Sequence, residues 1–343
     1  MVDLEEMLHF RLAMQEAISK WLYDPNVSYI DVGRPEHDGE IAWDELEVCI
    51  HVREKFPLSK LNMAIARGKT SGKIPKQIQG APVDIPKGDY RPQLWYWGWE
   101  STGGRTKSRT TRLDPLNCGS SVGNGRQRYA YGTLGAIVED KKTGRPMLLS
   151  DWHVLAGDWG ALRGQLIYQP AQADGGGHED SIAVLERDAI AQNLDAAVAF
   201  IIEGSRRLSD EQYGLGSLRG SRSPVLGLEV NKSGRVSNIT SGYVTTAIPG
   251  IQKMTYQGIT RVIRDVWRVE PPNPYGEVSS KGDSGSLWLE RQTNKAVGLH
   301  FAGTASPKRA LMMDIQAVME ALDIDLISQQ NLAYWNSKWD NGR

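Results

Sequence analysis

The sequence is poor in the features that mark several classes of protein. It has only two cysteines, Cys49 and Cys118, which lie far apart along the chain. Two such residues form no disulfide framework, so we expect a reducing compartment. The formal net charge of −1 gives no overall electrostatic reason to expect a nucleic-acid partner. The composition therefore favours neither a disulfide-rich secreted protein nor a nucleic-acid-binding one.

Signals for a membrane or an export route are also missing. No apolar run approaches the roughly 18 residues that a membrane-spanning helix needs. The first ten residues, MVDLEEMLHF, are acidic and lack the charged-then-apolar pattern of a secretory signal. We expect a cytoplasmic protein without a membrane partner.

Motifs for metal chemistry and for an α/β-hydrolase are absent too. The chain has no HExxH, no CxxC and no GxSxG. His9, His37 and His51 have no metal-ligand spacing, and His178-Glu179-Asp180 has no suitable ligand partners nearby. We therefore predict no metal site and no cofactor.

The first 90 residues alternate between helical and extended patterns. Residues 4–22 have apolar side chains at three- and four-residue spacing, which predicts an amphipathic helix. Residues 27–33 and 45–52 predict strands, residues 58–66 a short helix and residues 80–85 a last short strand. These patterns indicate a small α+β accessory domain over residues 1–90.

Residues 91–116 have the composition of a linker. Trp95, Trp97 and Trp99 alternate with other residues, which is typical of an aromatic face packed on a neighbouring domain; a peptide-docking surface is the alternative. The basic run over 103–112, GGRTKSRTTR, is interpreted as a solvated linker, with a nucleic-acid arm as the alternative.

From residue 117 the sequence becomes β-rich. Short runs such as GTLGAIVED, DAAVAFII and AVGLHFAG recur with Gly, Pro, Asn and Asp between them, which predicts a sandwich or a pair of barrels. Residues 313–327, MDIQAVMEALDIDLI, predict a closing helix that packs on the preceding barrel.

One stretch of this region has the pattern of a nucleophile turn. Ser284 lies between Asp283 and Gly285 in GDSGSLW, a turn that can hold a hydroxyl out of the chain but can also be an ordinary tight loop. A nucleophilic serine needs an adjacent base. His153 follows a predicted strand and is the best-mounted candidate, whereas His178 lies in a Gly-rich loop and His300 follows the serine.

A histidine base needs a carboxylate that orients it. Asp195 directly precedes the apolar run AAVAFII, where a buried carboxylate requires a hydrogen-bond donor such as a histidine N–H. A capping role in a turn is the alternative for Asp195. If it does not orient the base, Asp174, Asp180 and Asp188 are the next candidates.

Together these three residues resemble the catalytic set of a known family. The chain order His153, Asp195, Ser284 and its spacing are those of the trypsin/chymotrypsin-like serine proteases, with matching motifs SDWHVLAG, NLDAAVAF and GDSGSLW. The segment VNKSGRVSNITSGYV is similar to a hairpin of many bacterial members. IPKQIQGAPVDI, SVGNGRQRYAYGTLGAIVED and GQLIYQPAQADGGG resemble the plant NARROW LEAF-type trypsin-like proteases and their bacterial relatives.

The resemblance implies a fold and a domain order. It implies two six-stranded antiparallel chymotrypsin-like β-barrels, the first over residues 117–205 and the second over residues 206–343 with a C-terminal helix. It also implies a serine endopeptidase that acts on protein or peptide substrates. The alternative is a catalytically silent, protease-like scaffold that binds partners through the N-terminal domain; a homo-oligomer or a regulatory partner there is possible under either interpretation.

The resemblance also assigns roles around Ser284. The backbone N–H groups of Gly282 and Ser284 would form the oxyanion hole. Ser286 stands where the commoner motif has a second glycine, a departure that also occurs in glutamate-specific relatives. We do not interpret it as inactivating.

Substrate selectivity follows from the same resemblance. Val278 would form the floor of the primary pocket, with Glu277 one residue away, and His300 would lie on its wall, as in the GIHWGG segment of glutamyl endopeptidases. His300 can offer a carboxylate an N–H or a positive charge; packing under the barrel is its alternative role. We expect cleavage after acidic or apolar residues rather than after Arg or Lys.

Asp283 provides an expectation about activation. In secreted members of the family, a new N-terminus pairs with the aspartate that precedes the catalytic serine. Here no secretory signal indicates such processing, and a buried, unpaired Asp283 would be destabilising. We expect local N–H groups or side-chain donors of the folded chain to satisfy it.

Overall fold

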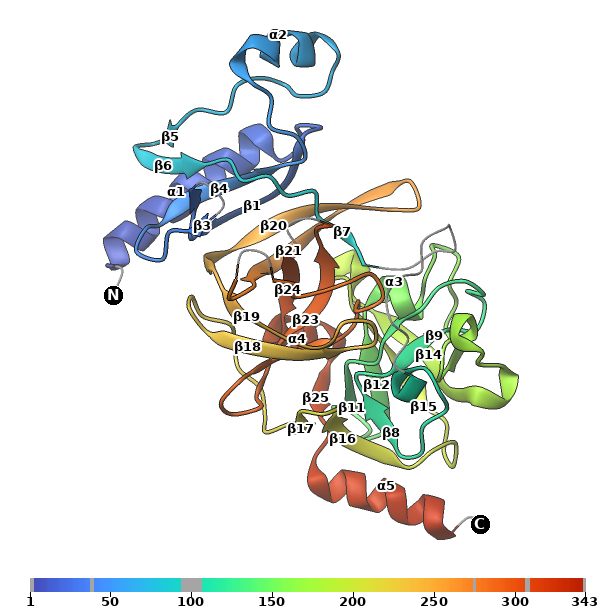
Figure 1. Ribbon diagram of the computed structural model, residues 1–343. Coiled ribbons are helices and arrows are strands. Elements are labelled where there is room, and N and C mark those ends of the chain that lie inside the picture. Colours follow the sequence, from blue (N-terminus) through green and yellow to red (C-terminus); the bar gives the residue numbers. More distant parts are fainter. Residues whose placement is uncertain (1–2, 38–39, 94–106, 274–275, 306–308, 342–343) are drawn as a thin grey trace.

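The structure, a computed structural model, describes residues 3–37, 40–93, 107–273, 276–305 and 309–341. Figure 1 shows an N-terminal module at one end, two strongly curled sheets beyond it and helix α5 at the opposite end. Strands outnumber helices among the described elements of the chain. The predicted segments Trp95, Trp97 and Trp99, and most of the basic run, lie outside the described residues.

The N-terminal module follows the predicted helix and strand pattern. Helix α1 packs on β1 and β4, and its buried face consists of Phe10, Ala13, Met14 and Ala17. The elements are α1 (Leu4–Trp21), β1 (Val27–Gly33), β2 (Glu36–His37), β3 (Glu40–Ile41), β4 (Glu47–Val52), α2 (Leu58–Ala66), β5 (Gln77–Ile78), β6 (Ala81–Asp84) and β7 (Arg91–Pro92). The helices and strands predicted over residues 1–90 are confirmed.

Within the described residues, the first curled sheet closes into a six-stranded barrel. Its order is β9-β13-β14-β15-β12-β11, and β10, which pairs with β9, runs almost directly into β11 and closes the ring. Its strands are β9 (Ser121–Asn124), β10 (Gly132–Thr133), β11 (Ala136–Asp140), β12 (Pro146–Ser150), β13 (Leu166–Tyr168), β14 (Ser181–Asp188) and β15 (Ala197–Ile201).

Short elements flank this first barrel. Helix α3 (Trp152–Leu155) directly follows β12, and β8 (Leu116–Cys118) pairs with β16 (Leu208–Gln212), which pairs with β17 (Gly216–Ser217). The 3-10 turns are η1 (Lys107–Arg109), η2 (Gln172–Asp174), η3 (His178–Asp180) and η4 (Ile190–Gln192). In the described part of the basic run, Arg109 is buried against Ser233 and Arg112 pairs with Asp180, so both cations make contacts within the chain.

The second curled sheet also closes with six strands in the described chain. The order is β19-β18-β22-β23-β24-β21, and a further β19–β21 pairing completes the ring. The strands are β18 (Glu229–Gly234), β19 (Asn238–Val244), β21 (Ile259–Glu270), β22 (Leu287–Glu290), β23 (Ala296–Gly303) and β24 (Ala310–Asp314). The predicted mainly β fold with two six-stranded barrels is confirmed.

One long hairpin joins the second barrel to the N-terminal module. Strand β20 (Thr246–Tyr256) pairs with β21 on one side and with β1 on the other, so the sheet continues through β4 and β6 to β5. Figure 1 shows β20 between β1 and β21. The accessory segment is therefore an extension of the barrel sheet.

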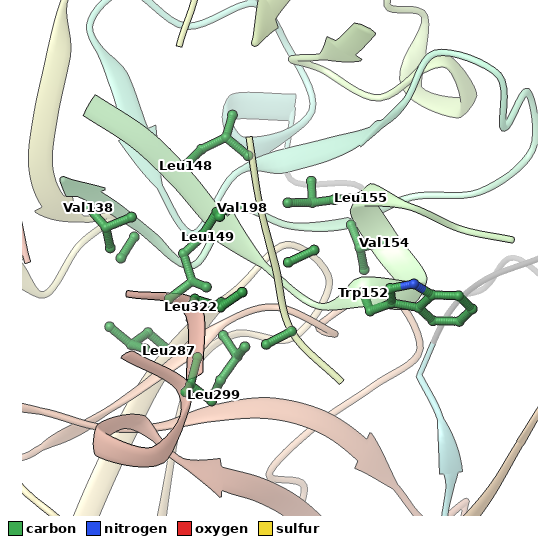
Figure 2. Close-up of a cluster of buried hydrophobic side chains, with 14 of the residues drawn as sticks. Val138, Leu148, Leu149, Trp152, Val154, Leu155, Val198, Leu287, Leu299 and Leu322 are labelled. Atoms are coloured by element: carbon green, nitrogen blue, oxygen red, sulfur yellow. The ribbon is translucent and has the colours of Figure 1, made fainter. Parts of the chain in front are cut away.

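The two barrels share a continuous apolar core. Figure 2 shows Leu287 and Leu299 of the second barrel pointing toward Leu149 of the first, with Leu322 beside them. These side chains are almost completely buried. Burial of a leucine side chain contributes about 1.5–3 kcal/mol, so this shared core holds the two barrels together.

The closing helix predicted over residues 313–327 is wrong in its extent. Helix α4 (Ile315–Leu322) ends at Asp323, which has the left-handed φ of +52°, and β25 (Ile324–Leu326) then pairs with β11. The alternation in this segment suits the edge of the first barrel better than a helical turn. The prediction also missed α5 (Gln329–Asn341), whose largely polar sequence has only a weak apolar stripe.

No helix within the described ranges combines the length and the apolar character that a membrane crossing requires.

Candidate active site

His153 and Asp195 meet at the first barrel. His153 lies in α3, the turn after β12, and Asp195 lies just before β15. The ring Nδ1–H of His153 donates to Asp195 Oδ2 at 2.5 Å, and the backbone N–H of His153 donates to Oδ1 at 3.1 Å. Both residues are almost completely buried. This pair of contacts fixes the ring orientation and leaves Nε2 as the free ring nitrogen.

A tyrosine from the other barrel completes the environment of Asp195. The Tyr256 hydroxyl, at the end of β20, donates to Asp195 Oδ2 at 2.5 Å. Burial, and then the charge of Asp195, raise the pKa of Tyr256 well above its usual range, so the phenol stays a donor. The Tyr256 ring stacks on the ring of His153, with centroids 5.9 Å apart. A buried carboxylate with three donors can stay charged.

A second carboxyl group lies on the other side of the histidine. Asp151 Oδ2 is 3.8 Å from His153 Nε2, and Asp151 is fully buried. Burial, and then the charge of Asp195, raise the pKa of Asp151 well above its usual range. This environment therefore favours the neutral form of Asp151.

The loop around Ser284 has a sharply turned backbone. Gly282 and Gly285 have left-handed φ angles of +103° and +89°. A Cβ on Gly282 would lie 2.4 Å from the Tyr131 ring, so a side chain fits here neither by conformation nor by space. Thr133 anchors the loop, because its N–H donates to the Ser284 carbonyl at 2.7 Å and its hydroxyl donates to the Gly282 carbonyl at 2.9 Å.

Asp283 is held inside the chain by the hairpin that the sequence singled out. Lys232 Nζ donates to Asp283 Oδ2 at 2.8 Å, and the N–H groups of Val236, Ser237 and Ser280 donate to the same carboxylate at 2.9–3.1 Å. Burial opposes the charge, but Lys232 and Ser237 outweigh it and hold the pKa of Asp283 well below its usual range. The expectation that local donors satisfy Asp283 is confirmed.

Ser284 lies beside the segment that carries His153, since a Cβ on Gly132 would meet both the Val154 side chain and the Ser284 carbonyl oxygen, but its hydroxyl is not hydrogen-bonded to the histidine. Its Oγ–H donates to the carbonyl of Phe301 at 3.2 Å. Within the described residues, His153 Nε2 has no hydrogen-bond partner.

The residues expected to select substrate differ in their surroundings. Val278 is fully buried in the apolar core of the second barrel, and the neighbouring Glu277 is exposed. Ser286 is buried, and its carbonyl accepts the N–H of His300 at 2.9 Å. His300 Nε2 is 2.7 Å from Gln93 Oε1.

His300 is neutral in this setting. Burial, and then the charge of Lys232, lower the pKa of His300 to about 3. Near pH 7 its ring therefore offers an N–H group but no positive charge. Sequence analysis proposed that His300 offers a substrate carboxylate either an N–H or a positive charge. In the structure only the N–H remains.

A cleft runs past the histidine, between the barrels and the N-terminal module. It has a volume of about 460 Å³, and its walls include Arg53, Tyr90, Trp152, His153, Tyr256 and Lys281. Residues from the accessory segment therefore form part of the wall opposite His153.

The other candidate carboxylates have partners elsewhere. Asp174 pairs with Arg235, Asp180 with Arg112 and Arg206, and Asp188 accepts the N–H of Ile190. His178 is exposed on its turn. Asp195 is thus the predicted carboxylate that reaches His153.

Three ligand-type side chains in the site lie close together. Suitable atoms of Asp151, His153 and Asp195 fall within 4.8 Å of one another. The 2.5 Å contact between His153 and Asp195 leaves no room for an ion between those two atoms. The arrangement suits proton transfer better than metal binding.

Sequence reasoning missed three residues of this site. Tyr256 lies on a strand with no motif around it, and Gln93 lies in the segment whose composition predicts a linker. Asp151 was visible in SDWHVLAG, two positions before the histidine, where a carboxyl group on the same turn was the available signal.

The strand order and closure described above match the chymotrypsin-like two-barrel fold. The similarity to Thermobifida fusca protease A covers 62% of this chain and 99% of that protein, with 15% sequence identity and a TM-score of 0.45. The similarity to a Nocardiopsis protease covers 63% of this chain and 99% of that protein, with 16% sequence identity and a TM-score of 0.45. A third similar structure is a glutamic acid-specific serine protease described as using a histidine triad in substrate binding. The similarity covers 62% of this chain and 100% of that protein, with 18% sequence identity and a TM-score of 0.43.

These likenesses concern the fold alone. No protein-family model matches the sequence, and no curated protein matches it. The resemblance to the plant NARROW LEAF-type proteases stays a prediction.

Proposed function

We propose that this protein is a serine endopeptidase that hydrolyses peptide bonds through His153, Asp195 and Ser284. The observation that carries the proposal is the buried 2.5 Å contact between His153 and Asp195 beside a cleft, with Ser284 beside the segment that carries the histidine. A histidine fixed in one tautomer by a carboxylate is the arrangement that activates a serine hydroxyl.

In this proposal each residue has one role. Ser284 Oγ attacks the substrate carbonyl, and its proton passes to His153 Nε2. Asp195, supported by Tyr256, stabilises the imidazolium that forms. The N–H groups of Gly282 and Ser284 donate hydrogen bonds to the oxygen that becomes negatively charged, and loss of one such donor typically lowers the rate by about 10²–10³. His153 then protonates the leaving amine, and water releases the acyl group.

The intact chain is part of the proposal. Asp283 has its counter-charge in Lys232, so the loop that carries the oxyanion donors needs no newly cut N-terminus. We place the enzyme in the cytoplasm, in keeping with two buried cysteines that remain free thiols. We expect no preference for cleavage after Arg or Lys, because Glu277 is exposed and Val278 carries no charge.

The test is labelling of Ser284 by a fluorophosphonate probe in full-length protein that mass spectrometry shows to be unclipped. Ser284→Ala is the control, since it removes one hydroxyl and leaves the loop. We expect labelling and hydrolysis of a mixed peptide library in the parent protein alone. Absence of both, before and after limited proteolysis, would favour the scaffold alternative. Labelling only after a cut near Gly132 would identify a conventional zymogen, and preferred cleavage after Arg would point to Glu277.

A further inference from the structure

A segment of the chain itself runs along the edge of the candidate site. Strand β7 pairs antiparallel with the end of β23, with Pro92 opposite Ala302 and Arg91 opposite Gly303. The next residue, Gln93, donates its backbone N–H to the carbonyl of Phe301 at 3.3 Å. The same carbonyl accepts the hydroxyl of Ser284, so Gln93 lies directly beside the proposed nucleophile.

The carbonyl of Gln93 is bound by the loop that carries the proposed nucleophile. It accepts the backbone N–H of Gly282 at 2.5 Å. Gly282 supplies one of the two N–H groups that the proposed mechanism assigns to the oxyanion. A donor aimed at a carbonyl oxygen beside the nucleophile is the geometry in which acyl transfer is catalysed.

The side chain of Gln93 is buried against His300 and Gly303. Its Oε1 lies 2.7 Å from His300 Nε2, and the residue is 5% exposed. A Cβ on Gly303 would come within 2.1 Å of Gln93 Nε2, so glycine at this position makes room for the amide. The N–H, the carbonyl and the side chain of one residue are thus all bound by the site.

We propose that Arg91–Gln93 occupies the acyl side of the substrate cleft as a substrate would, with Gln93 in the position before the reacting bond. The intact chain therefore blocks its own site, and the primary pocket selects glutamine. This inference rests on the proposed function for the naming of the pocket, and its binding test below does not require catalysis.

The pocket chemistry favours glutamine over glutamate. An amide oxygen accepts one N–H from His300 and brings no charge into the pocket. A glutamate carboxylate would be buried beside a neutral imidazole, because the pKa of His300 is lowered to about 3. The nearby cation, Lys232, is already paired with Asp283. Burial of a carboxylate without a counter-charge is strongly unfavourable.

The folded module keeps the segment in place. Tyr90, directly before the strand, is buried against Tyr29 and His51 of the N-terminal module. Arg309 of the second barrel donates to the carbonyl of Lys87 at 3.0 Å. A segment tethered in this way competes with free peptides at a high effective concentration, often in the millimolar range for short tethers.

The first experiment compares Gln93→Ala with Gln77→Ala in the full-length chain. Gln77 is an exposed glutamine of the same module, on β5. We expect Gln93→Ala to raise the rate of fluorophosphonate labelling and of peptide hydrolysis about tenfold or more, and Gln77→Ala to leave both unchanged. A cut between Gln93 and Leu94 that depends on Ser284 would also support the proposal. Equal rates in Gln93→Ala and the parent, without such a cut, would overturn self-blocking.

The second experiment measures binding without catalysis. Calorimetry at pH 7.5 follows acetyl-Arg-Pro-Gln-methylamide, with Glu and Ala peptides as matched ligands, on Ser284→Ala with and without Gln93→Ala. We expect the Gln peptide to bind about tenfold tighter than the other two, and only weakly while Gln93 is present. Equal binding of the three peptides, or no effect of Gln93, would refute the glutamine pocket. If the peptide binds as expected but no variant labels, the proposed function fails and the pocket stands.

Discussion

Within the described residues, two buried histidines are hydrogen-bonded to aspartates, and of these two only His153 lies at the cleft. Asp195 Oδ2 is 2.5 Å from His153 Nδ1, whereas Asp31 Oδ1 is 3.4 Å from His51 Nε2 in the N-terminal module. Both pairs are almost fully excluded from solvent. Burial and proximity of the two residue types are therefore not what distinguishes a candidate catalytic pair.

The difference lies in the counter-charge. Arg268 is buried beside Asp31, with Nε 3.7 Å from Oδ2. Burial opposes the charge of Asp31, but Arg268 and His51 outweigh it and lower the pKa of Asp31. Asp195 instead accepts hydrogen bonds from Tyr256 and His153. Protonation of His153 thus supplies a cation that Asp195 lacks, while at Asp31 that position is already taken by Arg268.

The largest expected effect separates the two aspartates. Asp195→Asn should lower kcat/KM for peptide hydrolysis about 10⁴-fold, because an amide at this position favours the wrong histidine tautomer. Asp31→Asn should change kcat/KM by no more than about threefold and lower the melting temperature instead. Steady-state kinetics and thermal unfolding of both variants check this. Near-full activity of Asp195→Asn would mean that another group orients His153, and Asp151 would be the next candidate.

The second test removes Arg268, the cation beside the Asp31–His51 pair. Arg268→Met should lower the free energy of unfolding by about 3–5 kcal/mol, since it leaves Asp31 buried without its counter-charge. Arg291→Met is the control, because Arg291 forms an exposed pair with Glu229 and should contribute less than about 1 kcal/mol. Urea unfolding gives both values. Equal losses in the two variants would show that Arg268 is not the stabilising partner.

A smaller effect is expected from the Tyr256 hydroxyl, which donates to Asp195 from β20. Tyr256→Phe removes one hydrogen bond to Asp195 and should lower kcat about tenfold, as expected for a hydrogen bond to a charged group. Tyr334→Phe, at an exposed tyrosine of α5, is the control. A rise in KM with unchanged kcat would show that Tyr256 acts as a wall of the cleft rather than on Asp195.

The smallest effect concerns pH. Burial lowers the pKa of His51 below its usual 6.5, so the unfolded chain takes up a proton there before the folded chain does. Stability should therefore fall as pH drops below 6.5, by at most about 1.4 kcal/mol per pH unit from this group. His51→Asn should make the dependence of unfolding free energy between pH 7 and 5 shallower. An unchanged slope would contradict a neutral His51.

The sequence identified the parts of the site that local patterns encode. His153, Asp195 and Ser284 each stand in a short motif whose chemistry can be read without a fold, and the hairpin that contains Lys232 is also recognisable from its local sequence. Helix α1 and strand β1 followed from periodicity in the same way.

The missing parts depend on contacts between distant segments. Tyr256 reaches Asp195 only because β20 crosses from the second barrel toward the first. The local composition around Gln93 predicts a linker, because its partners, Gly282 and His300, lie about 200 residues away along the chain. Strand β25 was assigned to a helix because the pairing edge of β11 is invisible to a local pattern.

The pairing of β1 with β20 has a consequence for how the protein is made. Strand β1 is buried along its whole length, and one of its two edges is covered only by β20. The ribosome releases β1 more than 200 residues before β20, as their positions in the chain require. Until β20 emerges, the nascent module presents an open, apolar strand edge, the kind of surface that recruits chaperones or aggregates. A fragment of residues 1–90 alone would keep that strand edge unpaired. We therefore expect such a fragment to aggregate rather than to behave as an independent domain.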